Sequence, residues 1–107
     1  MKKSEVHGIV TKNNQKFKYS VNVTNQFKKD FINCYIRGLD TKLLIKAVEI
    51  LAIEGKLPLE YKAHPLRGDY QDFMECHIKP DWLLVWQQKD DTLTLLLTNT
   101  GTHSDLF

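Results

Sequence analysis

The alternation of apolar and polar residues divides the chain into an early strand, two helices and three later strands. The stretch "FKYSVNV" over residues 17–23 places an apolar side chain at every second position, which is the period of a strand. Residues 27–35 repeat apolar side chains at helical spacing, and Gly38 is placed to end that helix. A second helix is predicted to begin near residues 40–41 and to end at Gly55, so the two form an antiparallel hairpin.

The second half of the chain has the pattern of a strand meander. "QDFMECHI" alternates, with Phe73, Glu75 and His77 on one face. "WLLVWQQ" is nearly all apolar, as in a central strand, and "TLTLLLT" follows after the turn residues "KDD". The segment before them, "KLPLEYKAHPLRGDY", carries Pro58 and Pro65 and excludes a regular helix. The order β-α-α-β-β-β predicts an α+β fold with a small antiparallel sheet.

The length and composition predict one globular domain. The chain has 107 residues, of which 1–16 show no clear period and are interpreted as a flexible extension to a domain at 17–107. No apolar run is long enough to span a membrane, and the N-terminus lacks the apolar core of a signal peptide. We therefore expect a cytoplasmic protein, whose Cys34 and Cys76 are free thiols.

Positive charge is concentrated near the start of the chain. Seven lysines precede residue 31, against Glu5 and Asp30, whereas the remainder holds eight basic and eleven acidic residues. This distribution favours a polyanionic partner, either a nucleic acid or an acidic protein, although a solvated lysine-rich tail has the same composition.

Three histidine-containing motifs carry the candidate chemistry. His64 lies in "AHPLRG", His77 and Asp81 lie in "ECHIKPDW", and His103 lies in "TGTHSDLF". Histidine suits proton transfer because its ordinary pKa of about 6.5 gives it both forms near neutral pH. The spacing contains no close pair of metal ligands, so we expect no metal and no cofactor.

The three motifs, in this order after a helix hairpin, resemble the YafQ family of the RelE superfamily, which are toxins of bacterial toxin–antitoxin pairs. The resemblance covers residues 17–107 and implies a RelE-like fold, a small sheet packed on a helix hairpin. It also implies an endoribonuclease that cuts messenger RNA in the ribosomal A site without metal. Its expected partners are ribosomal RNA, the messenger and an antitoxin of the RelB or DinJ kind. Promoter DNA would be bound only through the antitoxin.

Carried over motif by motif, the resemblance implies a set of working residues. The catalytic candidates are His64, His77, Asp81, His103 and Phe107. Residues expected to bind substrate are Arg67, Lys79, Trp82, Asn99 and Gly101.

The chain departs from the family pattern at Asn99. Many family members carry an arginine four residues before the terminal histidine, which would clamp a phosphate. With Asn99 here, Arg67 and Lys79 are the candidates to supply positive charge. The alternative interpretation is a catalytically weakened homologue that serves as a binding module for the antitoxin or the ribosome.

Metal-free RNA cleavage needs a base for the 2′-hydroxyl, an acid for the leaving 5′ oxygen and a cation for the phosphorane. We predict that His103 is the acid, with Gly101 letting the backbone approach a phosphate. Either His64 or His77 is then the base. Asp81 is expected to orient an imidazole, and Phe107 and Trp82 to stack on a base. The alternative for Trp82 is a place in the core.

Overall fold

The computed structural model describes residues 17–68 and 72–107, and the order of elements in them follows the sequence pattern with three short additions. The predicted flexible extension, residues 1–16, lies outside the described residues. The additions are the 3-10 turn η1, the two-residue strand β2 and the C-terminal helix α4. The elements are β1 (Ser20–Val23), α2 (Asn25–Ile36), α3 (Thr41–Glu54), η1 (Leu59–Tyr61), β2 (His64–Pro65), β3 (Phe73–Lys79), β4 (Trp82–Lys89), β5 (Thr94–Gly101) and α4 (His103–Leu106).

Side-chain caps determine where the two long helices begin, and a glycine ends the second. The Thr24 hydroxyl accepts a hydrogen bond from the Phe27 amide at 3.0 Å, and the Asp40 side chain accepts one from the Lys42 amide at 3.1 Å. Gly55 ends α3 with a φ of 79°, in the left-handed region that glycine favours. A Cβ at this position would lie 2.9 Å from the Tyr19 ring. The predicted helix boundaries are therefore confirmed.

The sheet is mixed rather than antiparallel throughout. Its strand order is β1-β5-β4-β3-β2, and the predicted antiparallel meander of β3, β4 and β5 is confirmed. β1, however, pairs with β5 in parallel, from Ser20 opposite Thr94 to Val23 opposite Leu97. The expectation of an antiparallel sheet is wrong for this strand. Short turns force the direction of β4 and β5, whereas β1 reaches the sheet through no such turn.

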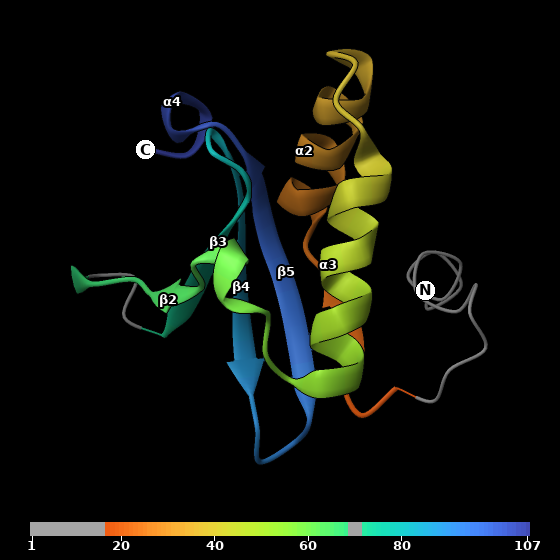
Figure 1. Cartoon of the computed structure of the whole chain (residues 1–107), viewed down its shortest axis with the longest axis vertical. Helices are drawn as coiled ribbons and strands as arrows, with labels where there is room; N and C mark the ends of the chain where they lie inside the picture. Colours follow the sequence, from red (N-terminus) through yellow and green to blue (C-terminus); the bar gives the residue numbers. More distant parts are fainter. Residues whose placement is uncertain (1–16, 69–71) are drawn as a thin grey trace.

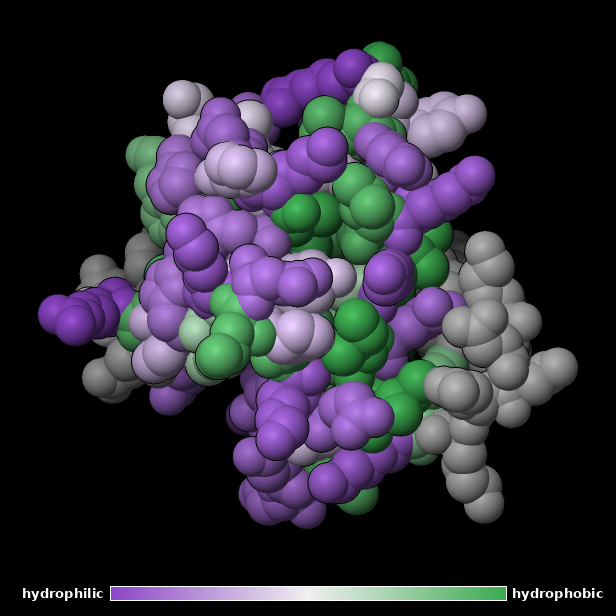
Figure 2. Space-filling model, viewed as in Figure 1, coloured by the Kyte–Doolittle hydropathy of each residue, from purple (hydrophilic) through white to green (hydrophobic). Residues whose placement is uncertain are grey.

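The two long helices cover one face of the sheet and leave the other open (Figure 1). On β4 the side chains of Trp82, Leu84 and Trp86 enter the core with the helices. Figure 2 shows hydrophobic residues gathered along the middle of the view, where helices and sheet meet. In the described part of the chain, no helix has the length and apolar character needed to cross a membrane.

A β-bulge in β5 decides which of its side chains reach the open face. Trp86 pairs with Leu97 and Val85 pairs with Asn99, so Thr98 is the extra residue. The Thr98 hydroxyl donates to the Val85 carbonyl oxygen at 3.0 Å. The bulge puts Asn99 on the open face, and β5 continues to Gly101. The strand predicted from the sequence ended before Asn99 and left this residue at the start of a turn. In the structure Asn99 lies within β5.

A bidentate ion pair holds the terminal helix α4 to the end of α2. The Arg37 guanidinium donates to the two carboxylate oxygens of Asp105 at 2.7 and 3.0 Å. Asp105 also accepts from the Thr102 amide at 2.9 Å in a capping box. These contacts, the Arg37 hydrogen bonds first, hold the pKa of Asp105 well below its usual range. A four-residue helix is not stable alone, so this attachment fixes the position of His103.

Trp82 is expected to stabilise the core. Its indole N–H donates to the Thr100 hydroxyl at 2.9 Å, and the side chain is 2% exposed. Trp82→Ala should lower the free energy of unfolding by about 3–5 kcal/mol. Trp82→Phe, which loses the N–H donor but keeps an aromatic ring, should cost about 1–3 kcal/mol.

Chemical denaturation followed by circular dichroism measures these losses. The matched control is Tyr35→Ala, which removes an aromatic side chain that is 68% exposed on α2 and should stay within about 0.5 kcal/mol. A Trp82→Ala loss no larger than that of the control would contradict a core role.

The ion pair between Arg37 and Asp105 should order α4. In Arg37→Gln the heteronuclear NOE of residues 103–107 should fall toward values of a flexible terminus. Because the pKa of Asp105 is lowered in the folded protein, its contribution is present above the unfolded value of about 3.9. The same NOE should therefore fall in the unmutated protein as the pH drops below that value. Lys42→Gln, an exposed cation on α3, serves as control. An unchanged NOE in Arg37→Gln would show that the capping box alone holds the helix.

Candidate functional site

Cross-strand pairing assembles four of the predicted site residues, His64, His77, Asn99 and Gly101, on the open face of the sheet. Residues directly opposite one another on neighbouring strands point to the same side. Two rows result, His64–Glu75–Val85–Asn99 and His77–Leu83–Gly101.

The three predicted histidines are successive neighbours, and we call this series the histidine line. The ring centroids of His64 and His77 are 6.5 Å apart, and those of His77 and His103 are 6.3 Å apart. Phe107 continues the line, with its ring 6.4 Å from that of His103. The line is built from β2, β3 and α4, so residues about 40 positions apart in the sequence meet here as a group.

An oxygen acceptor faces Nδ1 of each imidazole. His64 Nδ1 is 2.8 Å from the Lys62 carbonyl oxygen, and His77 Nδ1 is 3.2 Å from the Pro80 carbonyl oxygen. A carbonyl oxygen can only accept, so both of these nitrogens carry the hydrogen. In His77 this leaves Nε2 with a lone pair when the ring is neutral, and no contact in the described residues occupies that nitrogen.

Glu75 opens the motif "ECHIKPDW" but was not among the predicted site residues, and it contacts one of them. Its carboxylate oxygen is 3.0 Å from His64 Nε2, and its side chain is only 6% exposed. His64 therefore faces an acceptor at both ring nitrogens, and only the doubly protonated ring donates to both. The alternation had placed Glu75 on the same face as His77, and a buried carboxylate on a histidine face is the signal that could have identified it.

Asp81 contacts His103 rather than His77, its neighbour in sequence. One carboxylate oxygen is 3.5 Å from His103 Nδ1 and 3.4 Å from the His103 amide nitrogen. These are long contacts between side chains that are more than half exposed, so the attraction is weak and screened. Asp81 lies in the turn after β3, and His103 begins α4. The two residues are 22 positions apart in the sequence and come together only in the folded chain.

Two of the predicted substrate-binding residues have structural positions instead. Trp82 is buried in the core beneath the sheet and cannot stack on a nucleotide, so that expectation is wrong. Gly101 lies under the Asp105 carboxylate, where a Cβ would come within 2.8 Å of an oxygen. The close approach that this glycine permits is therefore the approach of α4, and not of a phosphate.

The two predicted cations differ in their surroundings. Lys79 is exposed at the end of β3 and lines a shallow hollow together with His77 and Lys62. Arg67 is exposed in the loop after β2, and no contact within the described residues joins it to a histidine. Lys79 thus shares this hollow with His77, Lys62 and Glu60, although it pairs with the core residue Trp82 after the β3 bulge.

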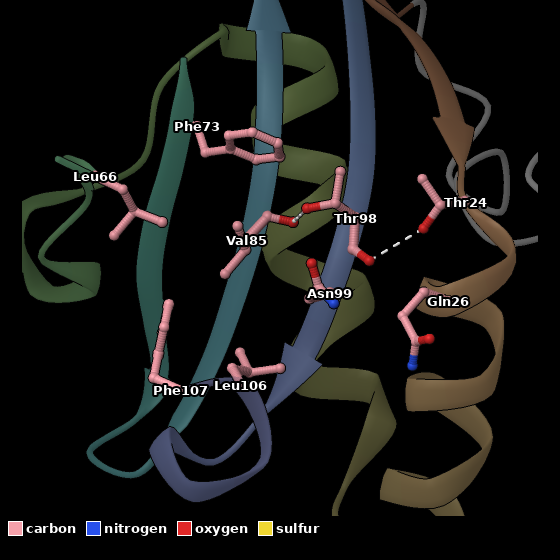
Figure 3. A pocket seen from close by; sticks show the side chains of 9 residues that line it. All are labelled: Thr24, Gln26, Leu66, Phe73, Val85, Thr98, Asn99, Leu106 and Phe107. Atoms are coloured by element: carbon pink, nitrogen blue, oxygen red, sulfur yellow. Dashed lines mark hydrogen bonds between the residues drawn. The ribbon is translucent and has the colours of Figure 1, made fainter. Parts of the chain in front are cut away.

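A pocket of about 320 Å³ adjoins this line and begins at Phe107 (Figure 3). Val85 and Thr98 lie at its base, with the ring of Phe73 at one end and that of Phe107 at the other. The remaining residues around it come from the β2 end, the start of α2, β5 and α4, and are Thr24, Gln26, Leu66, Asn99 and Leu106. The pocket combines aromatic ends with a polar side toward α2.

Asn99 lies at that polar side, beside a carboxylate of α2. Its Nδ2 is 3.5 Å from an oxygen of Asp30, and the Thr100 amide donates to the same oxygen at 3.1 Å. Gln26 donates to the other Asp30 oxygen at 2.8 Å. Sequence reasoning missed Asp30, because it lies on a helix about 70 positions from its partners and belongs to no motif.

Neither a metal cluster nor a reactive thiol is present among the described residues. No group of three histidine, cysteine, aspartate or glutamate side chains there is placed to hold a metal ion. Cys34 and Cys76 are both buried and free, and burial raises the pKa of Cys76 to about 12. A thiol with so high a pKa is not a nucleophile near neutral pH.

Comparisons with known proteins agree on one family. A family model described as the bacterial toxin of type II toxin–antitoxin system, YafQ, matches residues 19–107. The mRNA interferase toxin YafQ of Escherichia coli K12 is 35% identical over 89 residues, which are 81% of this chain and 94% of that protein.

Solved structures give the same result. The E. coli DinJ–YafQ toxin–antitoxin complex matches with a TM-score of 0.77 and 31% identity, over 84% of this chain and 98% of that one. A metal-bound toxin from Helicobacter pylori matches with a TM-score of 0.74 and 47% identity, over 81% of this chain and 97% of that one. The bound metal is a property of that toxin. The chain studied here belongs to the YafQ family, the bacterial toxins of type II toxin–antitoxin systems.

Proposed function

We propose that this YafQ-family toxin is an endoribonuclease that cuts messenger RNA on the ribosome without a metal ion. The observation that carries the proposal is the line of three imidazoles, spaced 6.5 and 6.3 Å apart on the open face of the sheet. A similar toxin of E. coli is named an mRNA interferase. The nucleophile is the 2′-hydroxyl of the RNA itself, so the protein needs only to move protons and stabilise charge.

His77 is the general base. Its Nδ1 hydrogen is directed at the Pro80 carbonyl oxygen, which leaves Nε2 to accept the 2′ proton. Its place in the middle of the line puts it between the two other histidines. The choice between His64 and His77 thus falls on the ring whose Nε2 has no acceptor beside it.

His103 is the general acid. As O2′ bonds to phosphorus, the bond from phosphorus to O5′ breaks and His103 donates the proton that O5′ needs. The products are a 2′,3′-cyclic phosphate and a 5′-hydroxyl. Asp81, with an oxygen 3.5 Å from Nδ1 and 3.4 Å from the His103 amide nitrogen, helps to orient the ring. At the end of the step His77 holds the proton that the 2′-hydroxyl lost, and exchange with water restores both rings.

His64 holds charge rather than transferring a proton. With the Lys62 carbonyl and the Glu75 carboxylate at its two nitrogens, the imidazolium form has both donors paired. Its positive charge, with that of Lys79 in the hollow that His77 also lines, stabilises the phosphorane. Glu75 keeps the ring in place, because its own side chain is buried.

Dependence on the ribosome follows from the modest charge of the site. Glu75 and Asp81 offset part of the positive charge of the histidines, and Asn99 is neutral. Affinity for free RNA comes largely from neutralised phosphates, so a site with few cations binds free RNA weakly. A ribosome that presents the messenger supplies the positioning that the toxin lacks.

The antitoxin is the protein partner. The similar E. coli toxin has been solved in a complex with its antitoxin DinJ. Antitoxin segments that fold on binding can cover a toxin surface, and the lysines at positions 28 and 29, exposed on α2, suit an acidic segment.

Removal of a proton-transferring histidine should abolish most of the activity. His77→Ala and His103→Ala should each slow cleavage of a translated messenger by about 10²–10⁴-fold, since each removes a general base or acid. His64→Ala should cost less, because it removes charge stabilisation only. Primer extension in a purified translation system measures the cuts. Lys46→Ala, an exposed residue of α3 on the other side of the sheet, is the control. Full activity in His77→Ala would assign the base to another residue.

A cation at position 99 should raise the rate. Asn99 lies in the row that begins at His64, so an arginine there would reach a phosphate bound over the histidines. We expect Asn99→Arg to cut about tenfold faster in the same assay. Asn99→Gln, which lengthens the side chain without adding charge, is the control. No gain with arginine would indicate that Lys79 or another cation already serves.

The same assay separates the enzyme from a binding module. If the unmutated toxin cuts nothing and Asn99→Arg does cut, the chain is a weakened homologue whose remaining function is binding. If neither cuts, antitoxin binding is the function left to test.

A further inference from the structure

The pocket between Phe73 and Phe107 has the features of a site for one unstacked base. It lies next to the histidine line, since Phe107 belongs to both. Val85 at its base is two residues along β4 from Leu83, which separates His77 from Gly101, a distance of about 7 Å for a strand. Proteins hold splayed RNA bases by stacking on aromatic rings and by hydrogen bonds to their edges. Both kinds of group are present here.

The Asp30 carboxylate determines which way the polar side of the pocket faces. A carboxylate accepts hydrogen bonds, so the amide side chains of Gln26 and Asn99 turn their nitrogens toward it. In Figure 3 the Asn99 oxygen points toward Val85 and Thr98, and its nitrogen points the other way. No hydrogen bond within the described residues reaches the Asn99 oxygen. It is therefore an acceptor available to a ligand.

The two hydroxyls at the pocket have no hydrogen to offer. Thr24 donates to the Thr98 carbonyl oxygen at 3.0 Å, and Thr98 donates to the Val85 carbonyl oxygen at 3.0 Å. Neither hydroxyl can therefore donate to a ligand. A ligand that pairs with the free Asn99 oxygen must bring the hydrogen.

We propose that this pocket binds the base of a nucleotide next to the cleaved bond and selects bases that carry an amino group, against uracil. The proposal rests on the proposed function for the RNA substrate, and adds which base the site accepts. Adenine and cytosine each present an exocyclic amino group, which donates to the Asn99 oxygen. Guanine also carries amino and ring N–H donors. The single ring N–H of uracil stands between two carbonyl oxygens, which would meet the oxygens of the pocket without a hydrogen between them.

Binding of single nucleotides tests the pocket without requiring cleavage. The isolated toxin is titrated with adenosine, cytidine and uridine 3′-monophosphates, and the backbone signal of Val85 and the side-chain amide signal of Asn99 are followed by NMR. The adenosine and cytidine nucleotides should bind about tenfold more tightly than the uridine nucleotide. Equal affinity for all three, or shifts confined to other parts of the sheet, would overturn the proposal.

Asn99→Leu offers a second test, because it removes the acceptor without touching Asp30 and should make the three affinities equal. Asp30→Asn is the matched control and should leave the preference unchanged. The Asp30 oxygen that accepts from the Thr100 amide is the one that Asn99 contacts, so the new NH₂ group faces Gln26 instead. An unchanged preference in Asn99→Leu would overturn the proposal.

Cleavage of matched messengers separates this proposal from the proposed function. Four messengers that differ at one base of the cut codon are translated with the unmutated toxin. Cuts that are about tenfold weaker at uracil support both proposals. Equal cutting at all four bases with equal nucleotide binding refutes the base preference and leaves the endoribonuclease intact. Selective nucleotide binding with no cutting refutes the endoribonuclease and leaves the pocket as a nucleotide site.

Discussion

The register of β4 against its two neighbours is the constraint on which the rest of the structure depends. β4 is buried on both faces, so its even-numbered side chains from Trp82 to Trp86 enter the core, and Leu83 and Val85 lie beneath the open face. A slip of one residue would exchange these sets and move two tryptophans out of the core to the opposite face of the sheet. β3 and β5 both pair with β4. The register of β4 therefore places His77 and Asn99 on the same open face, on the two strands that flank it.

Two bulges adjust this register where the site needs it. The one in β5 leaves Thr98 without a partner, and the one in β3 falls between His77 and Lys79. A bulge inserts one residue and exchanges the faces of everything that follows. In β5 this carries Asn99 to the open face and lets Thr100 turn inward, where its hydroxyl bonds Trp82 and Leu83. Neighbouring residues of β5 thus have different surroundings: Thr100 bonds groups in the core, and Asn99 faces the candidate site.

Local sequence patterns predicted most of the fold, and the motifs predicted the three histidines of the candidate site. Caps, glycines and alternation predicted the helices and the meander, because each depends on neighbours in sequence. The histidine line was foreseen only as a group of motifs, without its order. What escaped prediction depends on distant pairs: Asp30 with Thr100, and Arg37 with Asp105. The parallel pairing of β1 and the turn of Asp81 toward His103 belong to the same class. Trp82 was ambiguous because a tryptophan in a functional motif fits a core as well as a stacking surface.

Carboxylates position much of this site, and their charge limits what the site can do alone. Asp30 orients the amide of Asn99, Glu75 pairs with His64, Asp81 approaches His103, and Asp105 holds α4 in place. Each contact orders a side chain or an element that would otherwise be free. Each also adds negative charge near the place where the proposed RNA substrate binds. Arg37 compensates for Asp105, and Glu75 and Asp81 lie beside histidines, whereas Asp30 contacts only amide groups. A site built in this way gains geometry at the expense of affinity for free RNA, which agrees with the proposal that a ribosome holds the messenger for it.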